Sequence, residues 1–242
     1  MSSCHFCKVD PKKQLLSCVC KKVSYCSKEC QTKDWKIHKP SCPPYIIRES
    51  SGKGRGLFAT RKIKAGQVIL EEYPLLVLSD AGISVREFRV YHYPHIDDET
   101  KAKILQLNDP AENLKILDAE TVEKLLRKNP NMMLWKEARS DEISKIYRIL
   151  NDNHIGICEK EELYNISEAG LYHNFSRVNH SCVPNTVWSW VMGDFRKHQV
   201  RAIMTIEKNE EILVTYWEQP EKIQNERCLK IIHNTGKNNI II

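Results

Sequence analysis

Arg177-Val178-Asn179-His180-Ser181-Cys182-Val183-Pro184-Asn185 is the stretch of this sequence that carries the most information. The run joins amide side chains, a histidine, a serine and a cysteine in an order that chance seldom produces. Taken alone, His180 would most simply be a buried histidine with satisfied hydrogen bonds, because a short motif needs a matching context. The interpretation of the run therefore depends on the segments around it.

Two segments after this run have the alternating pattern of β-strands. The first spans residues 200–203, and the second spans residues 210–216 and ends at Tyr216. A lone tyrosine at the end of a strand usually belongs to the core. Tyr216 becomes a candidate functional residue because it closes the strand that begins with Glu210-Glu211-Ile212.

A glycine-rich segment, Gly52-Lys53-Gly54-Arg55-Gly56, lies far upstream and follows a predicted strand at residues 45–48. Glycines let backbone groups approach a ligand closely, although this pattern alone is more typical of an exposed turn. A dinucleotide-binding loop would need an amphipathic helix directly after the glycines. Residues 57–63 and 67–71 instead have strand patterns on either side of a turn at Lys64-Ala65-Gly66. We therefore predict a β-hairpin here and exclude a Rossmann fold.

The middle of the chain, residues 80–165, differs in character and indicates helices. Residues 118–127 carry oppositely charged side chains four positions apart, which stabilise a helix. A second helix is predicted to begin at Ser140, which would cap it ahead of Asp141 and Glu142.

Seven of the ten cysteines lie within residues 4–42. Structural zinc sites are closed by four nitrogen or sulfur ligands, so eight donors would make two sites. A segment this short has almost no apolar interior, and metal binding would therefore supply most of its folding free energy. The donors form four pairs: Cys4-x2-Cys7, Cys18-x-Cys20, Cys26-x3-Cys30 and His38-x3-Cys42.

This segment resembles a MYND zinc finger, above all in Tyr25-Cys26-Ser27-Lys28-Glu29-Cys30-Gln31, Asp34-Trp35-Lys36-x-His38 and Cys42. The ligands of that family interleave, and its fingers present a small surface to proline-containing peptides. Trp35 would belong to that surface or pack over the second zinc. The family usually has Cys-x2-Cys where this chain has the tighter Cys18-x-Cys20. The resemblance implies one site from Cys4, Cys7, Cys26 and Cys30, and a second from Cys18, Cys20, His38 and Cys42.

The glycine-rich segment, the run at 177–185 and the strand ending at Tyr216 resemble the parts of a SET domain and occur in its order. The resemblance implies an α+β fold: a mostly β SET core with a helical insertion at about 80–165, plus a small N-terminal two-zinc finger. Prolines 43 and 44 end the finger, so we predict domains at 1–44 and 45–242. In most SET proteins with a MYND finger the finger interrupts the SET domain. Here it precedes the SET domain, as in arthropod members of the group.

The resemblance also implies an activity, which is S-adenosylmethionine-dependent methylation of lysine in a histone or non-histone protein. Tyr216 would then be the catalytic residue that orients the lysine amine. The implied cofactors are S-adenosylmethionine and two Zn²⁺ ions in the finger. The implied cofactor-binding residues are Lys53, Gly54, Arg55, Asn179 and His180.

Three departures from the family leave a second function open, that of a catalytically weak or inactive scaffold in transcriptional regulation. Relatives follow the last strand with three close cysteines that bind a third zinc together with the cysteine of the Asn-His-Ser-Cys run. Here only Cys228 follows, so this post-SET cysteine module is missing, and Cys182 is a buried thiol or an incomplete ligand. Ile157 replaces a channel phenylalanine, and Arg177 replaces an apolar residue.

Charge and composition limit the partners. Residues 1–44 hold nine lysines and three acidic residues, so the net charge of +6 lies in the finger. Seven thiolates and two Zn²⁺ ions would lower it to about +3, which argues against nucleic acid as a partner. The sequence has neither a long apolar run nor a secretory signal. We expect a monomer in the cytoplasm and nucleus that binds protein substrates and proline-containing peptides.

Overall fold

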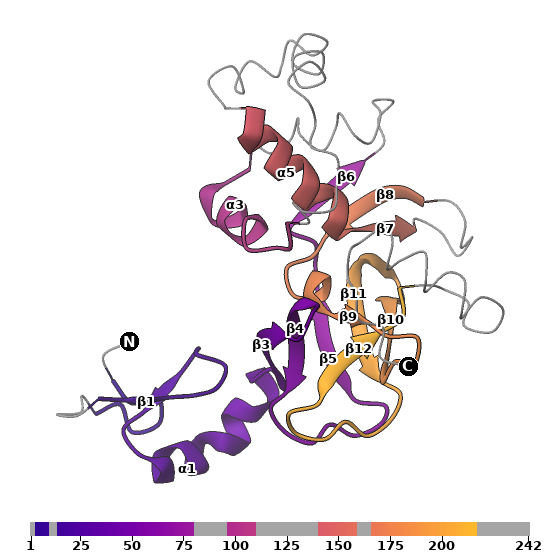
Figure 1. The fold of residues 1–242 in the computed structure, drawn as a ribbon. Coiled ribbons are helices and arrows are strands. Elements are labelled where there is room, and N and C mark those ends of the chain that lie inside the picture. Colours follow the sequence, from indigo (N-terminus) through magenta and orange to yellow (C-terminus); the bar gives the residue numbers. More distant parts are fainter. Residues whose placement is uncertain (1–2, 10–13, 80–95, 110–139, 159–165, 217–242) are drawn as a thin grey trace.

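The computed structural model describes residues 3–9, 14–79, 96–109, 140–158 and 166–216. Within them, the sheets form the centre of the molecule, the finger lies at one end, and helices α3 (Asp98–Ile104) and α5 (Ser140–Asn153) lie at the other (Figure 1). The predicted fold class, a mostly β SET core with helices and an N-terminal finger, is confirmed. No helix in the described ranges has the length and apolar character needed to cross a membrane.

The finger contains a short antiparallel pair, β1 (Leu16–Ser17) and β2 (Ser24–Tyr25), followed by helix α1 (Lys28–His38) and the 3-10 turn η1 (Lys39–Ser41). Ser27 caps α1, because its hydroxyl accepts a hydrogen bond from the amide of Cys30 at 3.3 Å. The small core of this module is built largely from cysteines, which fits a module that has little other apolar material.

Four strands form the sheet that carries the three motifs of the sequence analysis, in the order β3-β4-β12-β9. Strands β3 (Tyr45–Ser50) and β4 (Gly54–Ala59) make an antiparallel hairpin around the glycine-rich turn. Strand β12 (Glu211–Val214) pairs antiparallel with β4 and parallel with β9 (Asn179–His180). This sheet therefore unites segments that are more than a hundred residues apart in the sequence.

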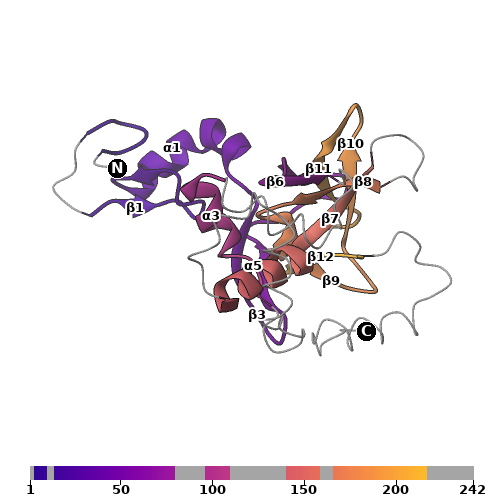
Figure 2. The same cartoon turned by 90° about the horizontal axis from the view of Figure 1, so that it is seen from above.

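A second sheet has the order β10-β11-β5, from strands β10 (Thr186–Val191), β11 (Asp194–Ala202) and β5 (Val68–Glu72). Figure 2 shows the β10–β11 hairpin on the side of the molecule away from the finger. A third sheet has the order β6-β8-β7, from β6 (Leu76–Ser79), β8 (Ile166–Leu171) and β7 (His154–Cys158).

The predicted hairpin over residues 57–71 is wrong. Residues 54–59 and 68–72 are strands, but β4 pairs with β3 and β12 whereas β5 pairs with β11. The connecting segment is held instead by Ile206, which bridges Ile63, and by the carbonyl of Ala202, which accepts from the amide of Gly66 at 2.8 Å. A turn signal marks where strands end and does not identify their partners.

Two apolar cores stabilise this arrangement. The larger one fills the space between the first two sheets, and its fully buried members include Leu57, Ile63, Tyr172, Ile206 and Ile212. The smaller one joins α3 and α5 to β8 through Ile104, Ile149, Leu150 and Leu171. The helix predicted from Ser140 is present as α5. The helix predicted at 118–127 lies outside the described residues.

Candidate active site and metal centres

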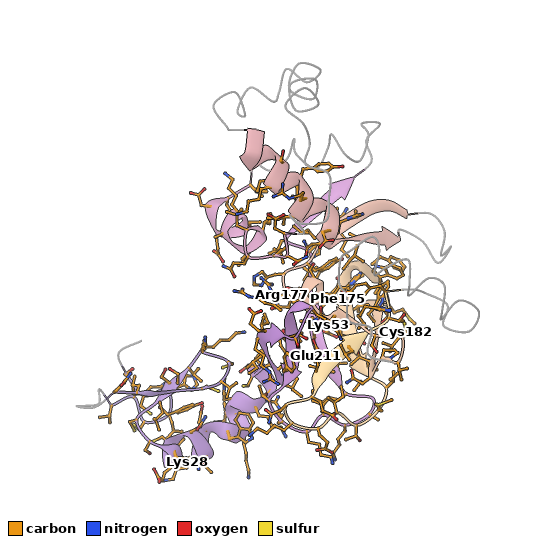
Figure 3. All side chains as sticks on the ribbon, in the orientation of Figure 1. Lys28, Lys53, Phe175, Arg177, Cys182 and Glu211 are labelled. Atoms are coloured by element: carbon orange, nitrogen blue, oxygen red, sulfur yellow. The ribbon has the colours of Figure 1, made fainter. Side chains whose placement is uncertain are left out.

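Sheet pairing brings the three sequence motifs together. Because β9 runs parallel to β12, Asn179 lies beside Leu213 and His180 beside Val214, two residues before Tyr216. On its other edge β12 pairs with β4, which begins in the glycine-rich turn. Figure 3 labels Lys53, at that turn, and Glu211, on β12, where it pairs with Phe58 of β4.

Asn179 is buried and fastens the glycine-rich turn to β12. Its Nδ2 donates to the carbonyl of Arg55 at 3.3 Å and to Glu211 Oε1 at 2.8 Å. Gly56 makes this approach possible, because a Cβ there would lie 2.2 Å from Glu211 Oε1 and 2.9 Å from Asn179 Nδ2. Glu211 is a site residue that the sequence reasoning missed, although it lies in the motif that singled out Tyr216.

His180 contacts the backbone of Tyr216. Its Nδ1 accepts a hydrogen bond from the Tyr216 amide at 3.1 Å, so the ring proton belongs on Nε2, which lies 3.4 Å from the Cys182 sulfur. Cys182 is half-buried and disulfide-bonded, so it is neither the buried thiol nor the incomplete metal ligand that the sequence analysis expected.

Tyr216 is held at both ends. Its hydroxyl donates to the carbonyl of Val178 at 2.9 Å, and its ring centroid lies 5.2 Å from that of His180. The residue as a whole is 39% exposed. Burial of the hydroxyl end raises the pKa of Tyr216, and the negative charges of Asp152 and Glu211 add to this effect.

The glycine-rich turn contains a buried lysine. Gly52 and Gly54 have φ of 67° and 69°, a backbone conformation that glycine adopts without strain. Between them, Lys53 is only 6% exposed, and its Nζ has no hydrogen-bond partner among the described residues. Arg55 is exposed and lies 3.7 Å from Glu49. The turn therefore offers a buried amine that lacks an acceptor.

The two unusual residues are both buried, Ile157 in β7 and Arg177 in the 3-10 turn η4 (Phe175–Arg177). The guanidinium of Arg177 donates to the carbonyls of His173 and Gln106, the latter at 3.1 Å. Burial lowers the pKa of Arg177, as does the nearby Arg55, whereas Glu72 opposes them. Arg177 thus ties the segment before Asn179 to the chain after α3.

Two groups of sulfur and nitrogen atoms in the finger have the arrangement of metal ligands. Cys4, Cys7, Cys26 and Cys30 form one group, and Cys18, Cys20, His38 and Cys42 form the other. Within each group the candidate ligand atoms all lie within 4.8 Å of one another. In the second group His38 Nε2 is 3.3 Å from the sulfurs of both Cys18 and Cys20, so the tight Cys-x-Cys spacing brings both thiols to one point.

Helix α1 positions both groups, because Cys26 and Cys30 lie at its beginning and His38 at its end. Trp35 on this helix packs edge-on to the His38 ring, with 6.1 Å between centroids. On its other side the Arg61 guanidinium lies 5.4 Å from the Trp35 ring and donates to the Cys42 carbonyl at 2.8 Å. Trp35 therefore packs beside the second ligand group, next to the SET core.

A buried carboxylate that the sequence reasoning did not single out supports the finger. Asp34 Oδ2 accepts from the Tyr25 hydroxyl at 2.7 Å and lies 2.9 Å from His5 Nδ1. Its pKa is lowered, because these hydrogen bonds and the charges of His5 and His38 outweigh the opposing effect of burial.

Comparison with known families matches a SET domain to residues 54–217, which is more than half of the chain, and a MYND finger to residues 4–42. The N-lysine methyltransferase SMYD2 of Homo sapiens is 27% identical over 228 residues, covering 93% of this chain and 47% of that protein. The SMYD2 of Bos taurus is 28% identical with the same coverage. The chain thus spans about half the length of these curated relatives.

Among solved structures, the SET domain of LSMT bound to lysine and AdoHcy aligns with a TM-score of 0.44 at 13% identity, covering 85% of this chain and 56% of that chain. Residues 54–217 of the family match contain the glycine-rich turn from Gly54, the Asn179–His180 strand and Tyr216, all of which meet along β12. The chain therefore belongs to the SET domain family and carries a MYND finger ahead of its SET domain.

Proposed function

We propose that this chain is an S-adenosylmethionine-dependent protein lysine methyltransferase whose finger recruits protein partners. The observation that carries the proposal is the meeting of the glycine-rich turn, Asn179, His180 and Tyr216 along one strand. Family membership supports the reaction class, and the SMYD2 relatives are named N-lysine methyltransferases.

The residues present fit a ligand with an amino-acid end. Lys53 Nζ is buried without a hydrogen-bond partner among the residues that the structure describes, which is unfavourable unless a ligand supplies an acceptor. A carboxylate such as the one in the methionine part of the cofactor would supply it. Gly54 adds no Cβ to the turn, and the nearest atom to a Cβ built there would be Asn108 Oδ1 at 3.7 Å. Lys53, Gly54 and Arg55 would therefore hold the cofactor from one side, and Asn179 and His180 from the other.

When bound, the cofactor would supply an electrophilic methyl group on a sulfonium. The lone pair of a neutral lysine amine would form a bond to the methyl carbon as the carbon–sulfur bond breaks in line with it, and the uncharged thioether would leave. The protein needs to align the reacting atoms and exclude water, and it forms no covalent bond itself. The raised pKa of Tyr216 keeps its phenol neutral, so its hydroxyl can accept from the substrate amine while it donates to Val178. The amine loses a proton to solvent on transfer.

The finger has a structural role in this proposal. Each of its two ligand groups matches the closed four-ligand arrangement of structural zinc, with His38 binding through Nε2. We propose that both groups hold Zn²⁺ and that the finger docks proline-containing peptides. Localisation to the cytoplasm and nucleus and a monomeric state stay predictions.

A weakly active or inactive scaffold is the second candidate. It is favoured by Ile157 and Arg177, which fill buried positions with side chains that are unusual in the family. In this case the finger would carry the function and the SET core would support it.

Titration calorimetry of the full chain with S-adenosylmethionine, followed by methyl transfer to an array of lysine-containing peptides, tests the proposal. The wild type should bind and transfer, and Tyr216→Phe should bind with unchanged affinity and transfer nothing. Tyr73→Phe is the matched control, because the exposed Tyr73 hydroxyl donates to Asp194 away from the site. An absence of binding by the wild type would contradict the proposal, and binding without any transfer would favour the scaffold.

A further inference from the structure

Side chains in and just before β10 donate hydrogen bonds to backbone carbonyls in and just after β12. The carbonyls of Glu211, Leu213 and Thr215 point the same way, since every second carbonyl of a strand does so. They accept, in order, from Asn185 Nδ2 at 2.8 Å, from Thr186 Oγ1 at 2.8 Å and from Trp188 Nε1 at 2.9 Å. Three side chains thus supply donors to backbone carbonyls at the end of this sheet, in addition to the pairing of β12 with β4 and β9.

The last of these donors acts next to Tyr216. Thr215 directly precedes Tyr216, and β12 ends at Val214, so Trp188 donates to the first carbonyl after the strand. Near this point the Tyr216 amide donates to His180 and its hydroxyl to the Val178 carbonyl. The peptide between Thr215 and Tyr216 is therefore held at its carbonyl by Trp188 and at its amide by His180.

Trp188 is itself immobilised by aromatic packing. Its ring stacks on His198 at 5.3 Å between centroids with 17° between planes, and His198 stacks in turn on Tyr172 at 4.3 Å and 25°. Phe175 meets Trp188 edge-on at 5.9 Å. Because His198 and Phe175 pack against the Trp188 ring, the direction of its N–H is fixed toward the Thr215 carbonyl.

We propose that Trp188 is a positioning residue that fixes the direction of Tyr216 through the Thr215 carbonyl. A catalytic role for this positioning of Tyr216 rests on the proposed function, in which Tyr216 orients the substrate amine. Trp188 itself lies on another sheet and acts only through Thr215. Without its N–H the peptide between Thr215 and Tyr216 would lose the hydrogen bond at its carbonyl, and the position of Tyr216 would be less tightly fixed.

Trp190 provides a matched control. It is the next inward-facing residue of β10, it packs against Trp188 at 5.5 Å, and its Nε1 is buried without an acceptor in the described part of the chain. Trp188→Phe and Trp190→Phe therefore make the same chemical change in the same aromatic cluster. Only the first removes a hydrogen bond to Thr215.

Residue-resolved amide hydrogen exchange tests whether the Trp188 hydrogen bond restrains Tyr216, and it does not require the protein to be active. In the full chain, Trp188→Phe should raise the exchange rate of the Tyr216 amide roughly fivefold or more over wild type, since one hydrogen bond to the same peptide is lost. Trp190→Phe should leave that rate within about twofold of wild type. Equal rates in the two variants would overturn the proposal. If Trp188→Phe melts at a much lower temperature than the control, replacing the indole by benzothiophene removes the N–H and keeps the bicyclic ring.

A methyl-transfer assay then tests whether the positioning of Tyr216 by Trp188 contributes to catalysis. Trp188→Phe should lower kcat about tenfold or more at an unchanged Kd for S-adenosylmethionine, because small displacements of a reacting group are costly. Trp190→Phe should keep wild-type kcat. A normal kcat in Trp188→Phe despite faster exchange would overturn the catalytic part. If the wild type neither binds S-adenosylmethionine nor transfers methyl, the proposed function fails. The exchange result still shows whether Trp188 restrains Tyr216.

Discussion

His198 makes the stability of the SET core depend on pH. Its ring is 1% exposed, it lies between Tyr172 and Trp188, and neither of its nitrogens has a hydrogen-bond partner in the described residues. Burial lowers the pKa of His198 to about 4 from an ordinary value of 6.5. The folded protein therefore resists a proton that the unfolded chain accepts readily.

The sign and size of the pH effect on the free energy of unfolding follow from the pKa difference between the folded and unfolded states. Above pH 6.5 both states are neutral at this residue, and stability is independent of its titration. Between pH 6.5 and 4 the unfolded chain binds more protons, so the free energy of unfolding falls as pH falls, by about 3 kcal/mol in total and about 2 kcal/mol by pH 5. Replacing His198 with phenylalanine keeps an aromatic ring for stacking and removes the titration.

Urea unfolding of wild type and His198→Phe at pH 7.5, 6.5, 5.5 and 5.0, followed by tryptophan fluorescence, measures the effect. Other groups that titrate, such as His173 and the ligands of the finger, are common to both proteins and cancel in the difference. The wild type should lose about 2 kcal/mol relative to the variant between pH 7.5 and 5.0. A constant difference across this range would show that His198 is protonated or hydrogen-bonded in the folded protein, and the reasoning would be refuted.

Three further outcomes are expected. Gly56→Ala should cost about 1–3 kcal/mol in urea unfolding and weaken S-adenosylmethionine binding in calorimetry, because its Cβ would displace Glu211 from Asn179; unchanged values would argue against this close approach. Lys53→Met should leave thermal stability equal or higher while lowering S-adenosylmethionine affinity about tenfold or more, since the buried Nζ has no partner to lose within the described ranges; a loss of stability at normal affinity would make Lys53 a structural residue. Elemental analysis should find two zinc ions per chain, and a strong chelator should abolish the helical signal of α1 while the SET core keeps its cooperative unfolding; one zinc per chain would contradict the second ligand group.

Local patterns predicted the parts of this fold better than their partners. Strands at residues 45–48 and 67–71 and a helix from Ser140 follow from alternation, turn residues and capping, and all three are present. The hairpin between β4 and β5 was wrong because strand pairing depends on distant segments, here residues 198–201 and 211–212. The resemblance grouped the eight metal ligands as the structure does, which spacing alone does not dictate.

The hydrogen bonds that complete the site could not be read from the sequence. The hydrogen bond between Asn179 and Glu211 forms because β12 lies between β4 and β9 in the sheet. The hydrogen bond from Trp188 to the Thr215 carbonyl forms because the fold also brings β10 close to the end of β12. A tryptophan in an alternating strand predicts burial, and nothing in the strand itself specifies a carbonyl on another sheet as its acceptor. The same holds for Arg177, whose unusual type was visible in the sequence but whose acceptor at Gln106 was not.

The buried nitrogens without partners show how one anomaly can have two physical meanings. Lys53, His173, Trp190 and His198 all have such atoms in the described ranges. A histidine can be buried in its neutral form, as the pKa values of about 4 for His173 and His198 indicate, and it then needs no ligand. The lysine side chain gives up more hydration on burial, and no acceptor among the described residues compensates for it. Lys53 is therefore the member of this set whose burial points to a bound anion, and it lies in the turn that the sequence motif had already marked.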